Sequence, residues 1–231
     1  MATFRISEVP VVVRPFDVTA VHGDSPHLFT HAMICVEAET RTDVTSNTEL
    51  EHFHMRPPLE TYRTYIHAVG SANLTLDENR QVKAFVDDRR SEKDAEDERC
   101  RILGARTPCQ YWLMPDSVPP SASLSIWKFS CVGFVRQSYR EAGIELLADA
   151  LPVRTLEELK CFYPDPDQTR ILENPALRER ITGLIGDGPW PVSLVGYLLH
   201  AFDRPDEEIH GKDSQPYRPK LSDSHFPTSV R

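Results

Sequence analysis

The sequence has little of what secreted and nucleic-acid-binding proteins normally carry. It holds 5 Cys among 231 residues, an odd number that follows no repeated spacing, so it encodes no disulfide framework and fits a reducing compartment. Basic residues are in the minority, with 26 Lys and Arg against 35 Asp and Glu and a formal net charge of -9. This balance argues against a nucleic-acid partner and gives no attraction to anionic lipid.

Long apolar runs are also missing. Stretches such as VSLVGYLL at 192–199 are far too short to span a bilayer, and the N-terminal stretch lacks the features of a secretion signal. The sequence therefore predicts a cytoplasmic protein with no integral membrane segment. GLIGDG at 183–188 is not followed by Lys-Ser or Lys-Thr, and no Gly-x-Ser-x-Gly elbow occurs, so neither a phosphate loop nor a serine hydrolase is predicted and no cofactor is expected.

The composition that remains is that of a globular domain, with 40% hydrophobic and 26% charged residues. Alternating and β-branched stretches dominate the first third, and helical periodicity begins in the second half. We expect a single α+β domain over 1–202, with an insertion near 41–60 that carries at most a short strand. A further strand is predicted at 82–86, a solvated loop or surface helix at 87–101, and a flexible or surface-laid tail over 203–231.

The segment FSCVGFVRQSYREAGIELL at 129–147 carries the clearest functional pattern. Residues at helical spacing along it are Cys131, Val135, Tyr139 and Ala142. Ser130 is a suitable N-cap and Gly143 suits the helix terminus. The pattern therefore predicts a helix that Cys131 opens.

A thiol in the first turn of a helix lies among unpaired backbone N–H groups, at the positive end of the helix dipole. Both stabilise the thiolate, which is the nucleophilic form of cysteine, and the same N–H groups can hold an oxyanion. The alternative interpretation of Cys131 is a small buried apolar residue, since free cysteine is among the most buried residue types. A nearby general base distinguishes the two.

Three segments together resemble a known family. FSCVGFVRQSYREAGI resembles the nucleophile helix of NlpC-type papain-fold cysteine peptidases, in which a Cys opens a helix of the pattern CSGFV…Y..AGI. THAMICVEA at 30–38 and YIHAVG at 65–70 resemble the two histidine strands of the circularly permuted branch of that superfamily, which includes lecithin:retinol acyltransferase-like enzymes. In that branch a histidine strand precedes the nucleophile helix. The resemblance implies a permuted papain-like fold, with the nucleophile helix packed on an antiparallel sheet.

The resemblance also implies roles for individual residues. Cys131 would be the nucleophile, His31 the general base, and His67 the third group that orients the imidazole. His54 is a rival for the third role, and His52 a weaker one. The backbone N–H of Cys131 would contribute to an oxyanion site.

Three residues directly before or near the cysteine are further candidates for the oxyanion site or the substrate pocket: Ser130, Trp127 and Phe129. Core packing beneath the helix is the alternative for the two aromatic residues. His31 could instead be a buried core histidine. His52 and His54 share a face if they lie on a strand, but two ligands without a third are weak evidence for a metal, and no metal site is predicted.

The predicted function is a cysteine hydrolase that acts by acyl transfer through a thioester, as a peptidase, amidase or related acyl hydrolase. An acyltransferase of the same fold is one alternative. The other is a catalytically silent papain-like domain that serves as a binding or scaffold module. The expected partner is an acyl substrate, whether a small molecule, a peptide or a lipid.

Overall fold

The computed structural model describes residues 2–5, 11–22, 29–36, 42–45, 47–55, 59–106, 117–122, 125–162, 170, 173–182, 188–210 and 214–224. Its strands are β1 (Ala2–Arg5), β2 (Val11–Val13), β3 (Val18–His22), β4 (Phe29–Cys35), β5 (Thr42–Val44), β6 (Glu49–Met55), β7 (Leu59–Tyr65), β8 (Ala68–Ser71), β9 (Ser117–Val118), β10 (Lys128–Phe129), β11 (Val153–Arg154) and β12 (Trp190–Pro191). Its helices are α1 (Leu76–Leu103), α2 (Cys131–Glu141), α3 (Leu156–Phe162), α5 (Pro175–Thr182) and α6 (Val195–Phe202), with short 3-10 turns η1 (Asp206–Glu208) and η2 (Leu221–Ser224).

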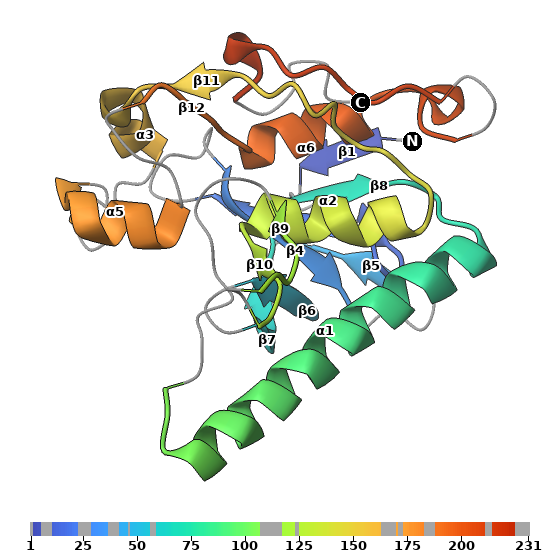
Figure 1. The fold of residues 1–231 in the computed structure, drawn as a ribbon. Helices are drawn as coiled ribbons and strands as arrows, with labels where there is room; N and C mark the ends of the chain where they lie inside the picture. The colour runs from blue at the N-terminus through green and yellow to red at the C-terminus, as the bar shows by residue number, and fades with distance from the viewer. Residues whose placement is uncertain are drawn as a thin grey trace.

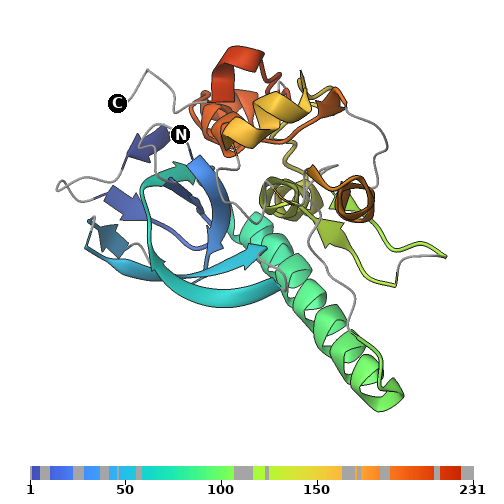
Figure 2. The same ribbon diagram turned by 90° about the vertical axis from the view of Figure 1, so that its left-hand side faces the viewer.

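The fold is α+β and centres on one antiparallel sheet. Six strands pair in the order β1-β8-β3-β4-β6-β7, and every pairing between neighbours is antiparallel. The sheet is strongly coiled, with α1 running alongside it (Figure 2). β3 and β4 occupy its centre, and β4 pairs with β3 along most of its length and with β6 at Ile34 and Cys35.

The two faces of the sheet serve two cores. Ala32 and Ile34 of β4 belong to the larger cluster, which also holds Val132 and Val135 of α2. The alternating residues Met33 and Cys35 belong to a smaller cluster with Val13 of β2 and Val44 of β5. Side chains alternate across a strand, so the first set defines the face of the sheet covered by helices and the second set defines the opposite face.

The described residues of 41–60 hold more than the short strand that the sequence predicts. β5 pairs with β2 in a separate two-stranded sheet, whereas β6 and the start of β7 belong to the main sheet and pair over seven residues each, from Glu49 opposite Tyr65 to Met55 opposite Leu59. The polar composition misled the prediction because Glu49 and Glu51 of β6 keep some exposure while they alternate with buried residues.

The predicted strand at 82–86 is wrong, because these residues lie in the long helix α1. That helix begins at a capping box, in which Thr75 accepts from the backbone of Glu78 and the Glu78 side chain accepts from the backbone of Thr75, and it ends at Gly104 in the left-handed conformation. Val82, Phe85 and Val86 form its buried stripe. Its distal part extends beyond the sheet (Figure 1), where pairs such as Glu98 and Arg101 stabilise an otherwise polar helix.

Helix α2 is the central helix of the molecule, in front of the sheet and between α6 and α1 (Figure 1). It packs against β4, β6 and α1. Gly143 follows its C-terminus with a φ of 78°, as the sequence predicts. The Tyr139 hydroxyl donates to the backbone oxygen of Phe16 at 2.8 Å, which ties the last turn of α2 to the chain segment before β3.

The described part of the C-terminal tail packs on the main body. Leu147 and Tyr217 form a parallel bridge, and Arg204 donates to the backbone oxygens of Ala201, Leu146 and Gln215. Residues 211–213 and 225–231 of the predicted tail lie outside the described residues. Over 203–210 and 214–224, the tail is laid on the domain surface.

Candidate active site

Cys131 is the first residue of α2, where the sequence predicts it. Ser130 is the N-cap, with extended backbone, and its hydroxyl accepts from the backbone N–H of Gly133 at 2.9 Å. Ser130 itself is buried. Cys131 is half-buried and packs against the larger core, so its thiol lies at the positive end of a buried helix, where nearby backbone N–H groups favour the thiolate.

The position of the helix start is set by an extended strand before Ser130 and by buried apolar residues after it. Lys128 and Phe129 form β10, paired with β9, so the chain arrives in extended conformation and turns into the helix at Ser130. From there the apolar residues Val132, Phe134 and Val135 enter the larger core. Their burial holds the first turn of α2, and Cys131 with it, against the sheet.

The sheet brings His31 and His54 together. Nε2 of His31 lies 2.9 Å from Nδ1 of His54, and the two rings meet edge to face at 5.2 Å. His31 is on β4 and His54 on the neighbouring strand β6. Of the three histidines that the sequence offers for the third catalytic role, His67, His54 and His52, the structure places His54 in contact with the predicted base.

A carboxylate extends this pair. Oε1 of Glu60 lies 3.3 Å from Nε2 of His54, whose side chain is 3% exposed while that of Glu60 is 46% exposed. Glu60 stands directly opposite His54 in the β6–β7 register. The Tyr62 ring packs beside His54 at 5.6 Å. The sheet therefore holds a row of polar contacts that runs from His31 through His54 to Glu60.

Sequence reasoning missed Glu60 and could have found it only through the hairpin. The segment EHFHMRPPLETY places two strand-like stretches on either side of a Pro-Pro pair, which favours a turn. Pairing Met55 with Leu59 across that turn puts His54 opposite Glu60. The strand register thus predicts that Glu60 lies beside His54, and the residue types alone do not.

His67 is placed elsewhere, which corrects its predicted role beside His31. Its ring lies against that of His22 at a tilt of 37° with centroids 3.7 Å apart, and its Nδ1 accepts from the His22 backbone N–H at 3.4 Å. The physical reason is strand order: β8, which His67 directly precedes, is separated from β4 by β3. Burial, and then the neighbouring His22, lower the pKa of His67.

Strand register assigns the histidine pair to a definite face. His31 pairs with Val21, which packs against the smaller core, and His54 lies between Phe53 and Met55, which both belong to the larger core. Regular alternation therefore gives both imidazoles the face opposite to α2. A register shift between Val21 and His22 lies beside His31, and bulges of this kind bend a strand and redirect its side chains.

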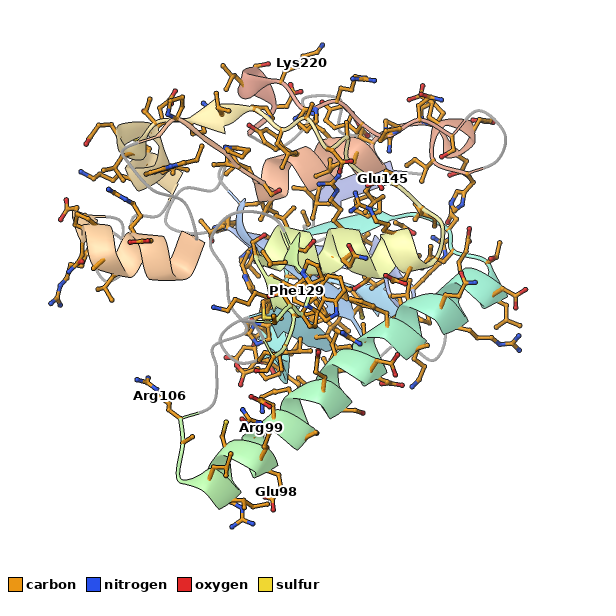
Figure 3. The ribbon with its side chains drawn as sticks, viewed as in Figure 1. Glu98, Arg99, Arg106, Phe129, Glu145 and Lys220 are labelled. Atoms are coloured by element: carbon orange, nitrogen blue, oxygen red, sulfur yellow. The ribbon has the colours of Figure 1, made fainter. Side chains whose placement is uncertain are left out.

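The two aromatic candidates pack in and against the core. Phe129, labelled in Figure 3, is fully buried, and its ring meets those of Phe85 on α1 and Phe134 on α2 edge to face. Trp127 is half-buried and stacks on Phe129 with centroids 5.4 Å apart and an interplanar angle of 3°. The guanidinium of Arg89 lies over the Trp127 ring at 5.7 Å. These contacts correspond to the core-packing alternative, with Trp127 alone retaining some exposure.

In the part of the chain that the structure describes, His, Cys, Asp and Glu side chains form no group of three or more that could hold a metal ion. No described helix is both long and apolar enough to cross a membrane.

Comparisons with known proteins give no relative. No family model, no curated protein and no solved structure matches this chain.

Proposed function

We propose that this protein is a cysteine enzyme that transfers an acyl group through a thioester on Cys131, in a papain-like arrangement of the permuted NlpC type. The observation that carries the proposal is the position of Cys131 as first residue of α2, on the helix that packs against the strand carrying His31. The hydrogen-bonded neighbour of that base is His54, which takes the third role in place of His67.

The proposed reaction begins with transfer of the thiol proton of Cys131 to His31. The sulfur then bonds to the acyl carbon of the substrate, and backbone N–H groups at the start of α2 stabilise the resulting oxyanion. His31 returns its proton to the leaving group as the bond to that group breaks, which leaves a thioester. Water attacks the thioester in a hydrolase, and a second nucleophile attacks it in an acyltransferase, with His31 accepting the proton in either case. The carbon–sulfur bond then breaks to release the product, and the sulfur of Cys131 takes the proton back from His31.

This chemistry requires the thiol and the imidazole to meet at the bulged end of β4. His31 follows directly on the bulge, and Cys131 is the first residue of α2. Since Nε2 of His31 contacts His54, the proposal assigns Nδ1 of His31 to the thiol.

Selective alkylation tests the proposal with an internal control. Cys161 is an exposed thiol on α3, so iodoacetamide labelling of both cysteines can be followed in one protein by peptide mass spectrometry. We expect Cys131 to react at least about tenfold faster than Cys161 near neutral pH, because a depressed thiol pKa raises the thiolate fraction. His31→Gln should remove this advantage and leave Cys161 unchanged. A Cys131 that reacts no faster than Cys161 would refute the enzyme proposal.

One observation favours a second function, a catalytically silent papain-like domain that acts as a binding or scaffold module. Regular alternation puts His31 and His54 on the sheet face away from α2, which would keep the imidazoles from the thiol. Acyl probes that differ in head group discriminate between the two functions. Covalent labelling of Cys131 by an acyl probe supports the enzyme, and slow, His31-independent alkylation supports the scaffold.

A further inference from the structure

We propose that Glu60 is a positioning residue that decides which ring nitrogens of His31 and His54 carry a hydrogen, here called the proton order of the pair. The catalytic meaning of this inference rests on the proposed function. Glu60 is the cross-strand partner of His54 in the β6–β7 hairpin. Its Oε1 atom lies 3.3 Å from Nε2 of His54, while Nδ1 of the same ring lies 2.9 Å from His31. One imidazole thus bridges a carboxylate and a second imidazole.

The carboxylate decides which nitrogen of His54 carries the proton. A neutral imidazole has one N–H, and a negative charge beside Nε2 favours the N–H there. Nδ1 of His54 is then an acceptor, so the 2.9 Å contact requires an N–H at Nε2 of His31. The lone pair of His31 is left at Nδ1, the nitrogen that the proposed reaction needs as a base.

The opposite order would disable His31 as a base. With the proton of His54 on Nδ1, the same 2.9 Å contact would use the lone pair at Nε2 of His31, and Nδ1 of His31 would carry a hydrogen. The two proton orders differ only in which ring nitrogens carry hydrogen, and the heavy atoms occupy the same positions in both. A charge at one end of the pair is therefore sufficient to select between them.

The surroundings of His54 make this charge effective. The ring is almost fully buried, so solvent screens the field at Nε2 less than it would on an exposed histidine. The Nε2–Oε1 contact lacks the alignment of a hydrogen bond and acts electrostatically. Among the residues that the structure describes, the titratable groups that face the ring are Glu60 and Tyr62 from β7 and His31 from β4, with His52 on the same face of its own strand.

Nitrogen-15 NMR of the imidazole rings in the full-length protein tests the proton order directly, independently of catalysis. In the wild type, at a pH where both rings are neutral, we expect N–H signals at Nε2 of both His54 and His31 and unprotonated signals at both Nδ1 atoms. Glu60→Leu, which removes charge and acceptor, should shift the population towards the opposite order. Glu60→Gln, which also removes the charge, should shift the population in the same direction, since the contact acts electrostatically.

Glu49→Leu is the matched control, since Glu49 is an exposed glutamate on the same hairpin, opposite Tyr65. It should leave the ring signals unchanged. A proton on Nδ1 of His54 in the wild type, or identical ring signals in Glu60→Leu and Glu49→Leu, would overturn the role of Glu60.

Alkylation then connects the proton order to the thiol. Glu60→Leu should slow the labelling of Cys131 near neutral pH by about tenfold, the size of a modest electrostatic effect, and should leave Cys161 unchanged. If wild-type Cys131 is no more reactive than Cys161, the proposed function fails while the NMR result still decides the role of Glu60. If Cys131 is reactive and Glu60→Leu alters neither its rate nor the ring signals, the role of Glu60 fails alone.

Discussion

Asp17 is a buried carboxyl group in the turn between β2 and β3. It is 2% exposed and its Oδ2 atom accepts from the backbone N–H of Arg14 at 2.8 Å. Burial raises its pKa from 3.8 to about 6, against the opposing effects of its hydrogen bonds to Ser71 and Arg14 and of the Arg14 charge. The folded state therefore holds this proton at a pH where the unfolded chain has lost it.

This difference predicts a pH-dependent stability at the residue scale. Because the folded pKa lies above the unfolded one, the contribution of Asp17 is fully present below about pH 4 and is lost as the pH rises through about 6. At about 1.4 kcal/mol per pKa unit, the loss amounts to roughly 3 kcal/mol. Asp17→Asn should lack this decline. Urea denaturation from pH 4 to 7 measures the free energy of unfolding. Asp77→Asn, which changes an exposed carboxylate on α1, is the control. Parallel plots of this free energy against pH for wild type and Asp17→Asn would contradict the expectation.

At the scale of elements, helix ends were predictable because their signals are local. Ser130 and Gly143 bound α2 as the sequence predicts, since capping uses atoms within three or four residues of each other. The sequence does not predict the β6–β7 hairpin, and for α1 it predicts a helix only over 87–101, as the alternative to a loop. For α1, the apolar run at 82–86 is typical of a strand by itself, and only the capping box at Thr75 and the ion pairs along the helix favour the helix.

One serine cap and one threonine cap give a matched pair of stability predictions. The Ser130 hydroxyl accepts from Gly133 in a buried environment, whereas the Thr155 hydroxyl accepts from Glu158 on the surface, at the start of α3. Ser130→Ala should lower the free energy of unfolding by about 1–2 kcal/mol, since a buried N–H loses its acceptor. Thr155→Ala should cost less, about 0.5–1 kcal/mol, because water can replace its hydroxyl. Equal losses in urea denaturation would show that burial of the cap is without effect.

At the scale of the whole molecule, strand order decides which distant residues meet. The sequence identifies His31 and His54 as candidates, but the choice between His54 and His67 depends on β3 separating β8 from β4. That order follows from pairing between segments far apart in the chain, which local periodicity does not encode. The same holds for Glu60, whose position relative to His54 is a property of the hairpin register.

The C-terminal tail gives a prediction at this scale. Arg204 is buried and donates to the backbone of Leu146 and Gln215, on the body and on the tail, so it clamps the two together. Arg204→Met should release the tail and speed trypsin cleavage after Lys220 (Figure 3) by about tenfold, since local opening controls such cleavage. Arg101→Met, at an exposed arginine on α1, is the control. An unchanged cleavage rate in Arg204→Met would mean that other contacts hold the tail.

The histidine pair and its carboxylate belong to strands between residues 31 and 60, whereas the sulfur arrives on a separate helix much later in the chain. The two halves of the candidate site are therefore built by different stretches of polypeptide and are joined only by packing. Loss of Cys131 would therefore leave the contact between His31 and His54 in the sheet intact. Under the proposed function, a variant without Cys131 would lack its nucleophile, yet the strands alone would preserve a proton acceptor.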